Sequence, residues 1–85
     1  MTSKQIRKAL IAGGVDMAGI VNVYRDEVHI AVIDEEAGVA DTRKTSKVSR
    51  QVAKVLPWKG FITQSGMVVL KRFFDADSAA QMNVD

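Results

Sequence analysis

The sequence predicts one α+β domain in which a four-stranded antiparallel sheet carries two helices on one of its faces. Two stretches have the apolar spacing of helices, a pair of strand-like stretches follows each of them, and glycine or proline separates helix from strand. The expected order is helix, hairpin, helix, hairpin (αββαββ) within residues 1–74, followed by a flexible acidic tail at residues 75–85. Eighty-five residues are enough for a single domain with a thin core.

The first helix is expected at about residues 3–13. Thr2 and Gln5 have the spacing of a capping box, in which each side chain bonds a backbone N–H at the helix start. Gly13 and Gly14 end the helix, because glycine adopts the left-handed conformation at little cost. The apolar residues that share one face of this helix are Ile6, Ala9 and Leu10.

The first hairpin is expected to pair Gly19–Tyr24 with Val28–Ile33 around a turn at Asp26-Glu27. Asp-Glu is a poor residue pair for a tight turn, so two alternatives remain: a longer loop, or a loop that starts at Arg25. The strands alternate between apolar and mixed residues, which indicates a hairpin buried on one side. The expected partners are Val23 with Ile30, Val21 with Val32, Tyr24 with His29, and Asn22 with Ala31.

The second helix is expected at about residues 43–56, after a polar loop at residues 34–41 that carries four acidic side chains. Asp41 or Thr42 can cap its start, and Pro57 ends it because proline disfavours the helical conformation of the residue before it. The residues expected to face the sheet are Val48, Val52, Val55 and Leu56.

The second hairpin is expected to pair Gly60–Gln64 with Met67–Phe73 around Ser65-Gly66. Both of its faces are partly apolar, which indicates strands in the middle of the sheet or strands covered by a partner chain. The tail is expected to be frayed, with a short helical turn near residues 78–82. The expected partners are Thr63 with Val68, Phe61 with Leu70, and Ile62 with Val69.

The net charge is +2, but the charges are unevenly distributed. Residues 1–41 carry four basic and seven acidic side chains, residues 42–74 carry eight basic and no acidic ones, and residues 75–85 carry three acidic and no basic ones. Segregated charge indicates a charged partner more strongly than the net value does. The cations that fall within one arc of roughly 60° on the second helix are Arg43, Lys47, Arg50 and Lys54.

This cationic arc predicts a small nucleic-acid-binding protein of accessory or regulatory type, with DNA as the first candidate and the phosphate backbone as the group contacted. Arg50 and Gln51 are candidate readers of base edges in a major groove, and Ser46 and Ser49 can bond phosphates. The expected nucleic-acid-binding residues are Arg43, Lys44, Lys47, Arg50, Gln51, Lys54, Lys59, Lys71 and Arg72.

Two alternatives stand beside this prediction. The acidic loop at residues 34–41 and the acidic tail can neutralise the helix, whose like charges three or four residues apart repel each other. The chain can also be an inhibitor or adaptor that binds an acidic protein surface, or a homodimer formed through Met67–Phe74. Trp58 is expected either to stack on a base or to pack at the edge of the core against Phe73.

The stretch KVSRQVAKVL at residues 47–56 resembles the recognition helix of helix-turn-helix proteins, and a hairpin follows it as a wing does in winged-helix proteins. The resemblance implies contact with DNA. It covers this stretch alone, because such domains place two further helices before the recognition helix and residues 1–40 supply one expected helix.

Catalytic and metal chemistry find little support in the sequence. Cysteine is absent, and His29 is the single histidine, expected as a surface residue of a strand. The acids at residues 34–41 lack the spacing of a calcium loop, and the glycines do not form a phosphate-binding loop. We therefore expect no enzyme activity, no metal and no cofactor. Short apolar runs and the lack of a signal-like N-terminus predict a cytoplasmic protein without a membrane span.

Overall fold

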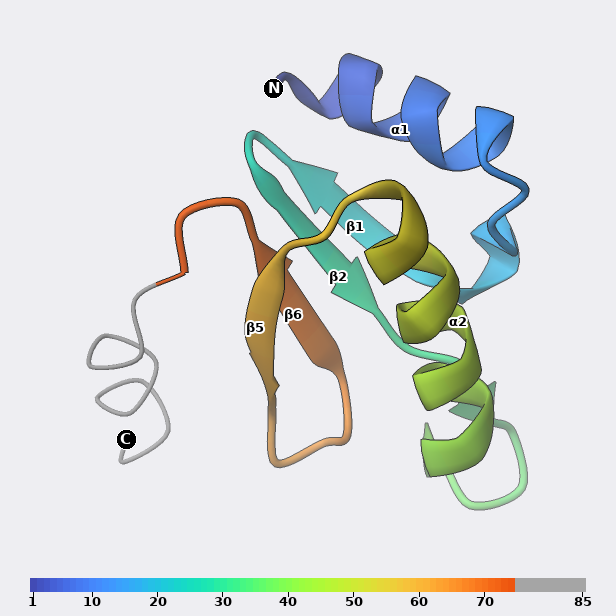
Figure 1. Cartoon of the computed structure of the whole chain (residues 1–85). Coiled ribbons are helices and arrows are strands. Elements are labelled where there is room, and N and C mark those ends of the chain that lie inside the picture. Colours follow the sequence, from blue (N-terminus) through green and yellow to red (C-terminus); the bar gives the residue numbers. More distant parts are fainter. Residues whose placement is uncertain (75–85) are drawn as a thin grey trace.

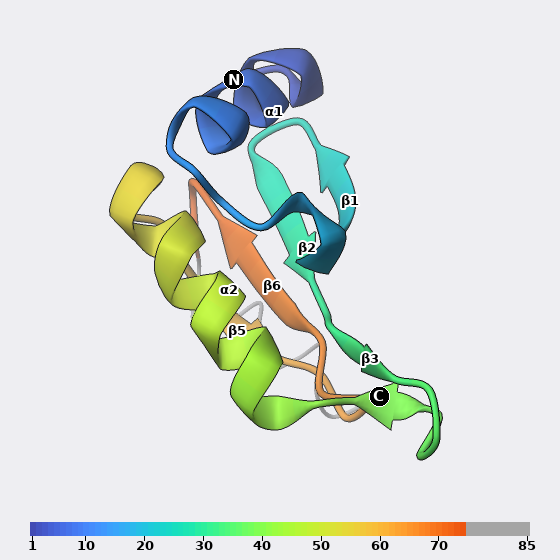
Figure 2. The same ribbon diagram turned by 90° about the vertical axis from the view of Figure 1, so that its right-hand side faces the viewer.

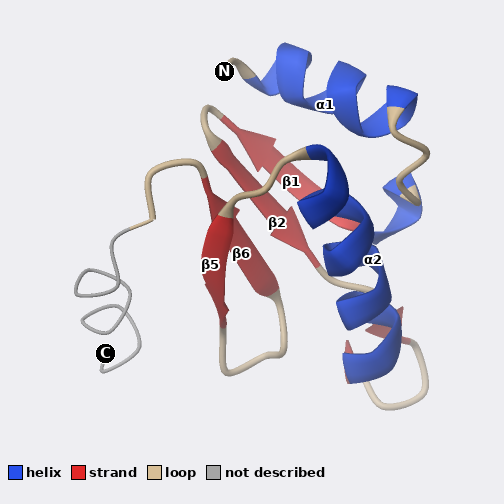
Figure 3. Ribbon diagram, viewed as in Figure 1, coloured by secondary structure: helices blue, strands red, loops and turns tan. Residues whose placement is uncertain are grey.

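A four-stranded antiparallel sheet in the order β1-β2-β6-β5 organises residues 1–74, the part of the chain that the computed structural model describes (Figure 1). The strands are β1 (Ile20–Tyr24), β2 (Glu27–Ile30), β5 (Lys59–Ile62) and β6 (Val68–Lys71). Two helices accompany them, α1 (Ser3–Ala12) and α2 (Thr42–Val55), drawn in blue in Figure 3. These elements confirm the α+β class, the four-stranded antiparallel sheet and the two helices. The predictions for the tail at residues 75–85 lie outside the described residues.

The simple αββαββ order is wrong in one segment. The region expected to be a polar loop contains a short two-stranded ribbon, β3 (Ile33–Asp34) and β4 (Val39–Ala40), and a 3₁₀ helix, η1 (Met17–Gly19), precedes β1. Gly38, with φ of +70°, supports the turn of the ribbon in the left-handed conformation that glycine tolerates. Figure 2 shows the ribbon beyond the end of the main sheet, next to the start of α2.

Both helices end where the sequence predicts, to within one residue. The Thr2–Gln5 capping box is present at α1, and Gly13 follows the last helical residue. At α2, the Asp41 carboxylate accepts a hydrogen bond from the Lys44 backbone N–H at 2.9 Å, which caps the helix start. Leu56 has an extended conformation, as a residue before proline prefers.

The turn of the first hairpin is Arg25-Asp26, which confirms the alternative that starts at Arg25, and the register therefore differs from the one expected for a turn at Asp26-Glu27. Asp26 has φ of 55°, a left-handed conformation that aspartate adopts more readily than most residues. Moving the turn by one residue changes every partner, and a bulge then shifts the register once more between Ile20 and Asn22. The observed partners are Tyr24 with Glu27, Val23 with Val28, Asn22 with His29, and Ile20 with Ile30.

The second hairpin also differs from its predicted register. Thr63 donates its backbone N–H to the Met67 carbonyl at 2.8 Å, and the loop between them holds three residues, with Gly66 at φ of +87°. Three-residue hairpin loops commonly end on such a left-handed residue. The observed partners are Ile62 with Val68, Phe61 with Val69, Gly60 with Leu70, and Lys59 with Lys71.

This register also corrects the expected pairing of Trp58 with Phe73. Because Lys59 lies opposite Lys71, Phe73 lies beyond the end of β6 and cannot be the cross-strand partner of Trp58. Phe73 is 74% exposed, whereas Trp58 is half-buried and packs against the core.

The core lies between the sheet and the two helices. Ile6 and Leu10 of α1, and Val52 of α2, are fully buried, as the sequence predicts. They meet the face of the sheet that carries Val28 and Leu70, which are neighbours across β2 and β6. The remaining buried members of the cluster are Val15, Val23, Ile30, Val48 and Leu56.

Asp26 joins three separate segments at the tip of the first hairpin. Its carboxylate accepts hydrogen bonds from the Met1 ammonium and from Arg72, the latter at 3.4 Å. Its backbone N–H donates to the Met1 carbonyl and its carbonyl accepts from the Arg72 N–H, each at 3.0 Å. The Met1 ammonium, which donates to the carboxylate, holds the pKa of Asp26 below its usual value.

Replacing the carboxylate by an amide should make stability less dependent on pH. A carboxyl group whose folded-state pKa is lowered stabilises the fold above its unfolded-state pKa, and this contribution is lost as the pH falls through the folded-state pKa. We therefore expect Asp26→Asn to unfold at lower urea than the wild type at pH 7, with the two midpoints converging below pH 3.8.

Asparagine also tolerates the left-handed conformation at this position, so the variant tests the charge rather than the turn. Glu35→Gln is the control, because Glu35 is exposed and has no ion pair within residues 1–74. A difference between wild type and Asp26→Asn that stays constant from pH 7 to pH 3 would contradict this account.

Candidate nucleic-acid interface

Helix α2 divides its circumference into three stripes, which follow from a rotation of about 100° per residue. The buried stripe, Thr45, Val48 and Val52, faces the sheet. Beside it lies a hydroxyl stripe formed by Thr42, Ser46 and Ser49, and beyond that lies a cationic stripe formed by Arg43, Lys47, Arg50 and Lys54. All four cations of this stripe are exposed.

Thr45 attaches α2 to the chain that leaves β2. It is 2% exposed, and its hydroxyl oxygen accepts a hydrogen bond from the Val32 backbone N–H at 3.0 Å. The Val32 carbonyl in turn accepts from the Asp41 N–H at 2.7 Å. These two bonds set the first turn of α2, and with it the cationic stripe, at a defined place along the sheet.

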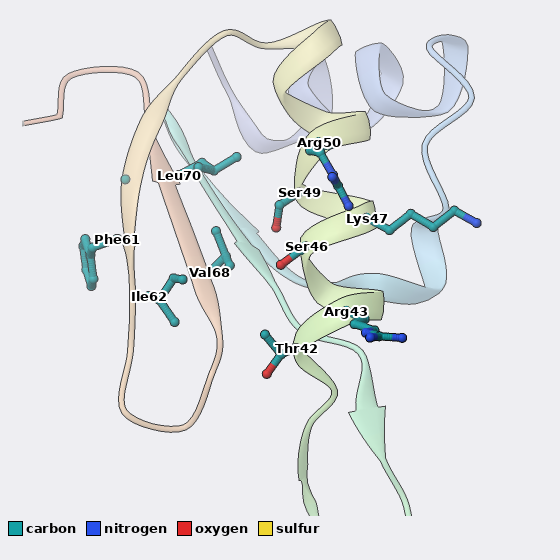
Figure 4. Close-up of a pocket in the computed structure, with 11 residues that line it drawn as sticks. Thr42, Arg43, Ser46, Lys47, Ser49, Arg50, Phe61, Ile62, Val68 and Leu70 are labelled. Carbon is teal, nitrogen blue, oxygen red and sulfur yellow. The ribbon is translucent and has the colours of Figure 1, made fainter.

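A groove of about 800 Å³ runs between α2 and the second hairpin (Figure 4). In Figure 4 the hydroxyl groups of Thr42, Ser46 and Ser49 point from α2 toward the strands. Ile62, Val68 and Leu70 point from β5 and β6 toward the helix. The groove therefore has a hydroxyl wall on one side and an aliphatic floor on the other.

The cations lie along the outer rim of this groove. Arg43, Lys47 and Arg50 line it, and in Figure 4 their side chains extend from α2 on the side away from the strands. Because the hydroxyl stripe separates them from the aliphatic floor, the groove presents charge, hydroxyl groups and apolar surface in that order.

Gly60 is required by the close approach of β5 to β6 at the groove. A Cβ atom there would lie 1.6 Å from the Val69 carbonyl oxygen, a collision with backbone that no side-chain movement relieves. Ile62, two residues further along the edge strand, is 63% exposed. Phe61, between them, also borders the groove, although its ring points away from α2 (Figure 4).

No cation of the stripe forms an ion pair with a described acid. The ion pairs within residues 1–74 join Asp26 to Met1 and Arg72, and Glu27 to His29 and Lys71. None of them involves a cation of α2 or an acid of the loop at residues 34–41. Neutralisation of the helix by that loop, one of the two alternatives raised by the sequence, is therefore not seen among the described residues.

The predicted contacts Lys44 and Gln51 lie on the other flank of α2. The Gln51 side-chain oxygen accepts a hydrogen bond from the Asp16 backbone N–H at 2.9 Å, so this side chain supports the segment before η1. Lys44 and Gln51 line a second, smaller hollow of about 280 Å³ together with Asp16, Val32 and Lys47 of the cationic stripe. Neither Lys44 nor Gln51 lines the groove, whereas Lys47 borders both hollows.

The predicted nucleic-acid-binding residues outside α2 do not extend the cationic stripe. Lys59 and Lys71 pair with each other across β5 and β6, on the face of the sheet opposite α2, since Gly60 and Leu70 between them face the helix side. Lys71 forms an ion pair with Glu27, with 3.4 Å between its Nζ and the carboxylate oxygen, and Arg72 forms an ion pair with Asp26. Trp58 packs against the core.

The sequence pointed to the cations and to Ser46 and Ser49, but not to the groove. Thr42, Ile62 and Val68 complete it, and their contribution depends on how β5 lies beside the helix. The sequence indicated strands in the middle of the sheet, whereas β5 is an edge strand, and an edge strand has no neighbour on one side to cover its apolar residues.

Comparisons of the chain with protein-family models, with curated proteins and with solved structures found no match. Within residues 1–74, no helix has the length and apolar character needed to cross a membrane. The same residues contain no cluster of three histidine or acidic side chains that could hold a metal ion. A proposal of function therefore rests on the charge and shape of the groove and the helix beside it.

Removing the hydroxyl of Thr45 should loosen the attachment of α2. Thr45→Val leaves the part-buried Val32 N–H without this acceptor, which costs about 1 kcal/mol of stability. Thr42→Val is a matched control, since it makes the same change at an exposed position of the same helix. Thermal or urea unfolding of both variants measures the difference, and equal losses would argue against the proposed attachment.

Proposed function

We propose that this protein binds nucleic acid, and that the cationic stripe of α2 contacts the phosphate backbone. The observation that carries the proposal is the stripe itself: four exposed cations on one side of a helix, none of them paired with an acid within residues 1–74. Such cations repel each other in the free protein and gain most from an anionic partner.

The arrangement of the stripe suits a repeating anion. Arg43, Lys47, Arg50 and Lys54 recur about once per helical turn, so that they form a row with a spacing of about 5.4 Å. Phosphates also recur at regular intervals along a nucleic-acid strand. The hydroxyl groups of Thr42 and Ser46 lie beside this row and can donate to phosphate oxygens. DNA is the first candidate ligand, as the sequence predicts. We propose an accessory or regulatory role for the protein together with it.

Removing two charges from the stripe should weaken binding and reduce its dependence on salt. We expect Arg50→Gln combined with Lys54→Gln to lower the slope of log K against log salt by about one unit for each lost phosphate contact. Fluorescence anisotropy of labelled oligonucleotides across a salt series measures both quantities.

The matched control combines Arg7→Gln with Lys8→Gln, which removes one arginine and one lysine from exposed positions of α1. Equal losses in both double variants would show that net charge alone matters. Absence of binding by the wild type to single-stranded or duplex nucleic acid at low salt would overturn the proposal.

A second candidate is a protein-interaction module, and two features favour it. β5 is an edge strand of the sheet, and an edge presents unpaired backbone groups to another chain. Phe73, just beyond β6, is 74% exposed, so its ring offers apolar surface to a partner. A partner protein or a second copy of this chain can cover both.

If Phe73 mediates self-association, Phe73→Ser should convert a dimer into a monomer in sedimentation experiments. Ile11→Ser is the control, because Ile11 is 64% exposed on α1 and lies far along the chain from this surface. A wild-type protein that stays monomeric at high concentration would remove the homodimer from consideration.

A further inference from the structure

We infer that the groove beside α2 receives the bases of single-stranded nucleic acid, while the cationic stripe holds its phosphates. This inference rests on the proposed function and narrows it to one kind of ligand, a single strand rather than a duplex. Its basis is the chemical division of the groove into cationic rim, hydroxyl wall and aliphatic floor.

A ligand that offers only phosphate groups does not match the aliphatic floor of the groove. Ile62, Val68 and Leu70 offer no hydrogen bond, and a polar group placed on them would lose its water without gaining a partner. Ile62 is 63% exposed and therefore gains from being covered by an apolar surface. The occupant of the groove must be apolar where it meets the floor and anionic where it meets the rim.

A single nucleic-acid strand has this division. Its phosphates line one side, and its unstacked bases present flat, largely apolar faces on the other. In a duplex the faces of the bases are buried in the stack, so that a duplex can use the cationic stripe but not the aliphatic floor. The hydroxyl wall lies between the two surfaces, where the polar edges of the bases and the sugar would lie.

The hydroxyl wall permits many bases, because a hydroxyl group can both donate and accept a hydrogen bond. Thr42 and Ser46 have no hydrogen-bond partner for their side chains within residues 1–74, whereas the Ser49 hydroxyl already donates to the Thr45 carbonyl at 2.8 Å. The floor is aliphatic, so it supplies contact without the geometry of aromatic stacking. Binding with little dependence on base identity is the expected consequence.

The experiment compares the binding of a single strand with that of a duplex, for the wild type and for variants of the floor. The probes are labelled oligothymidylate and oligouridylate of about 12 nucleotides, which lies within the site sizes of single-strand-binding domains, and a DNA duplex of the same length. The wild type should bind the single strands about tenfold more tightly than the duplex at equal salt. The two single strands together distinguish DNA from RNA as the source of the ligand.

Ile62→Ser should weaken single-strand binding about fivefold and leave duplex binding unchanged. Ile62→Tyr should strengthen single-strand binding, because an aromatic ring adds a stacking surface at the same exposed position. Ile11→Ser, at an equally exposed site on α1, should change neither. Circular dichroism of each variant verifies that the fold is retained.

The outcomes separate this inference from the proposed function. Equal affinity for single strand and duplex, with no effect of either substitution at Ile62, would overturn the groove as a base site and leave the cationic stripe as a phosphate site. Binding of neither nucleic acid would overturn both. Competition by oligoglutamate of the same charge is a further test. If oligoglutamate displaces the labelled probe as well as oligothymidylate does, charge alone selects the ligand, and the inference is overturned.

Discussion

The width of helix α2 determines which strand of the sheet stays uncovered. An α-helix with its side chains is about 10 Å across, and neighbouring strands lie about 4.8 Å apart, so one helix covers about two strands. The buried stripe of α2 packs over β2 and β6, and α1 packs against β1. The edge strand β5 is left beside α2 rather than beneath it, which opens the groove and exposes Ile62.

Polar contacts keep this geometry in place. The Thr45 hydroxyl holds the start of α2 to Val32, and Gly60 lets β5 approach β6 closely at the groove. On the opposite edge, Asp26 joins the tip of the first hairpin to Met1 and Arg72. The ion pairs within residues 1–74 all lie away from α2, and none of them includes one of its cations.

The periodic features of this chain could be predicted from its sequence, and the features that depend on a one-residue shift could not. The helices, their caps and the buried residues Ile6, Leu10 and Val52 follow from local patterns that repeat every few residues. The strand partners were wrong in both hairpins, because a turn that is one residue longer or displaced by one residue changes every pair. The β3–β4 ribbon was missed because each strand has only two residues.

The sequence by itself determined the cationic stripe, since the positions of Arg43, Lys47, Arg50 and Lys54 around a helix follow from their spacing alone. The tertiary structure decided which other candidates could join it. Gln51 is occupied by the Asp16 N–H, and Lys71 lies on the opposite face of the sheet, held by Glu27. The places of Gln51 and Lys71 depend on strand register and on groups that are distant in the chain. The aliphatic floor of the groove does so too, because it exists only where β5 passes beside the hydroxyl stripe of α2.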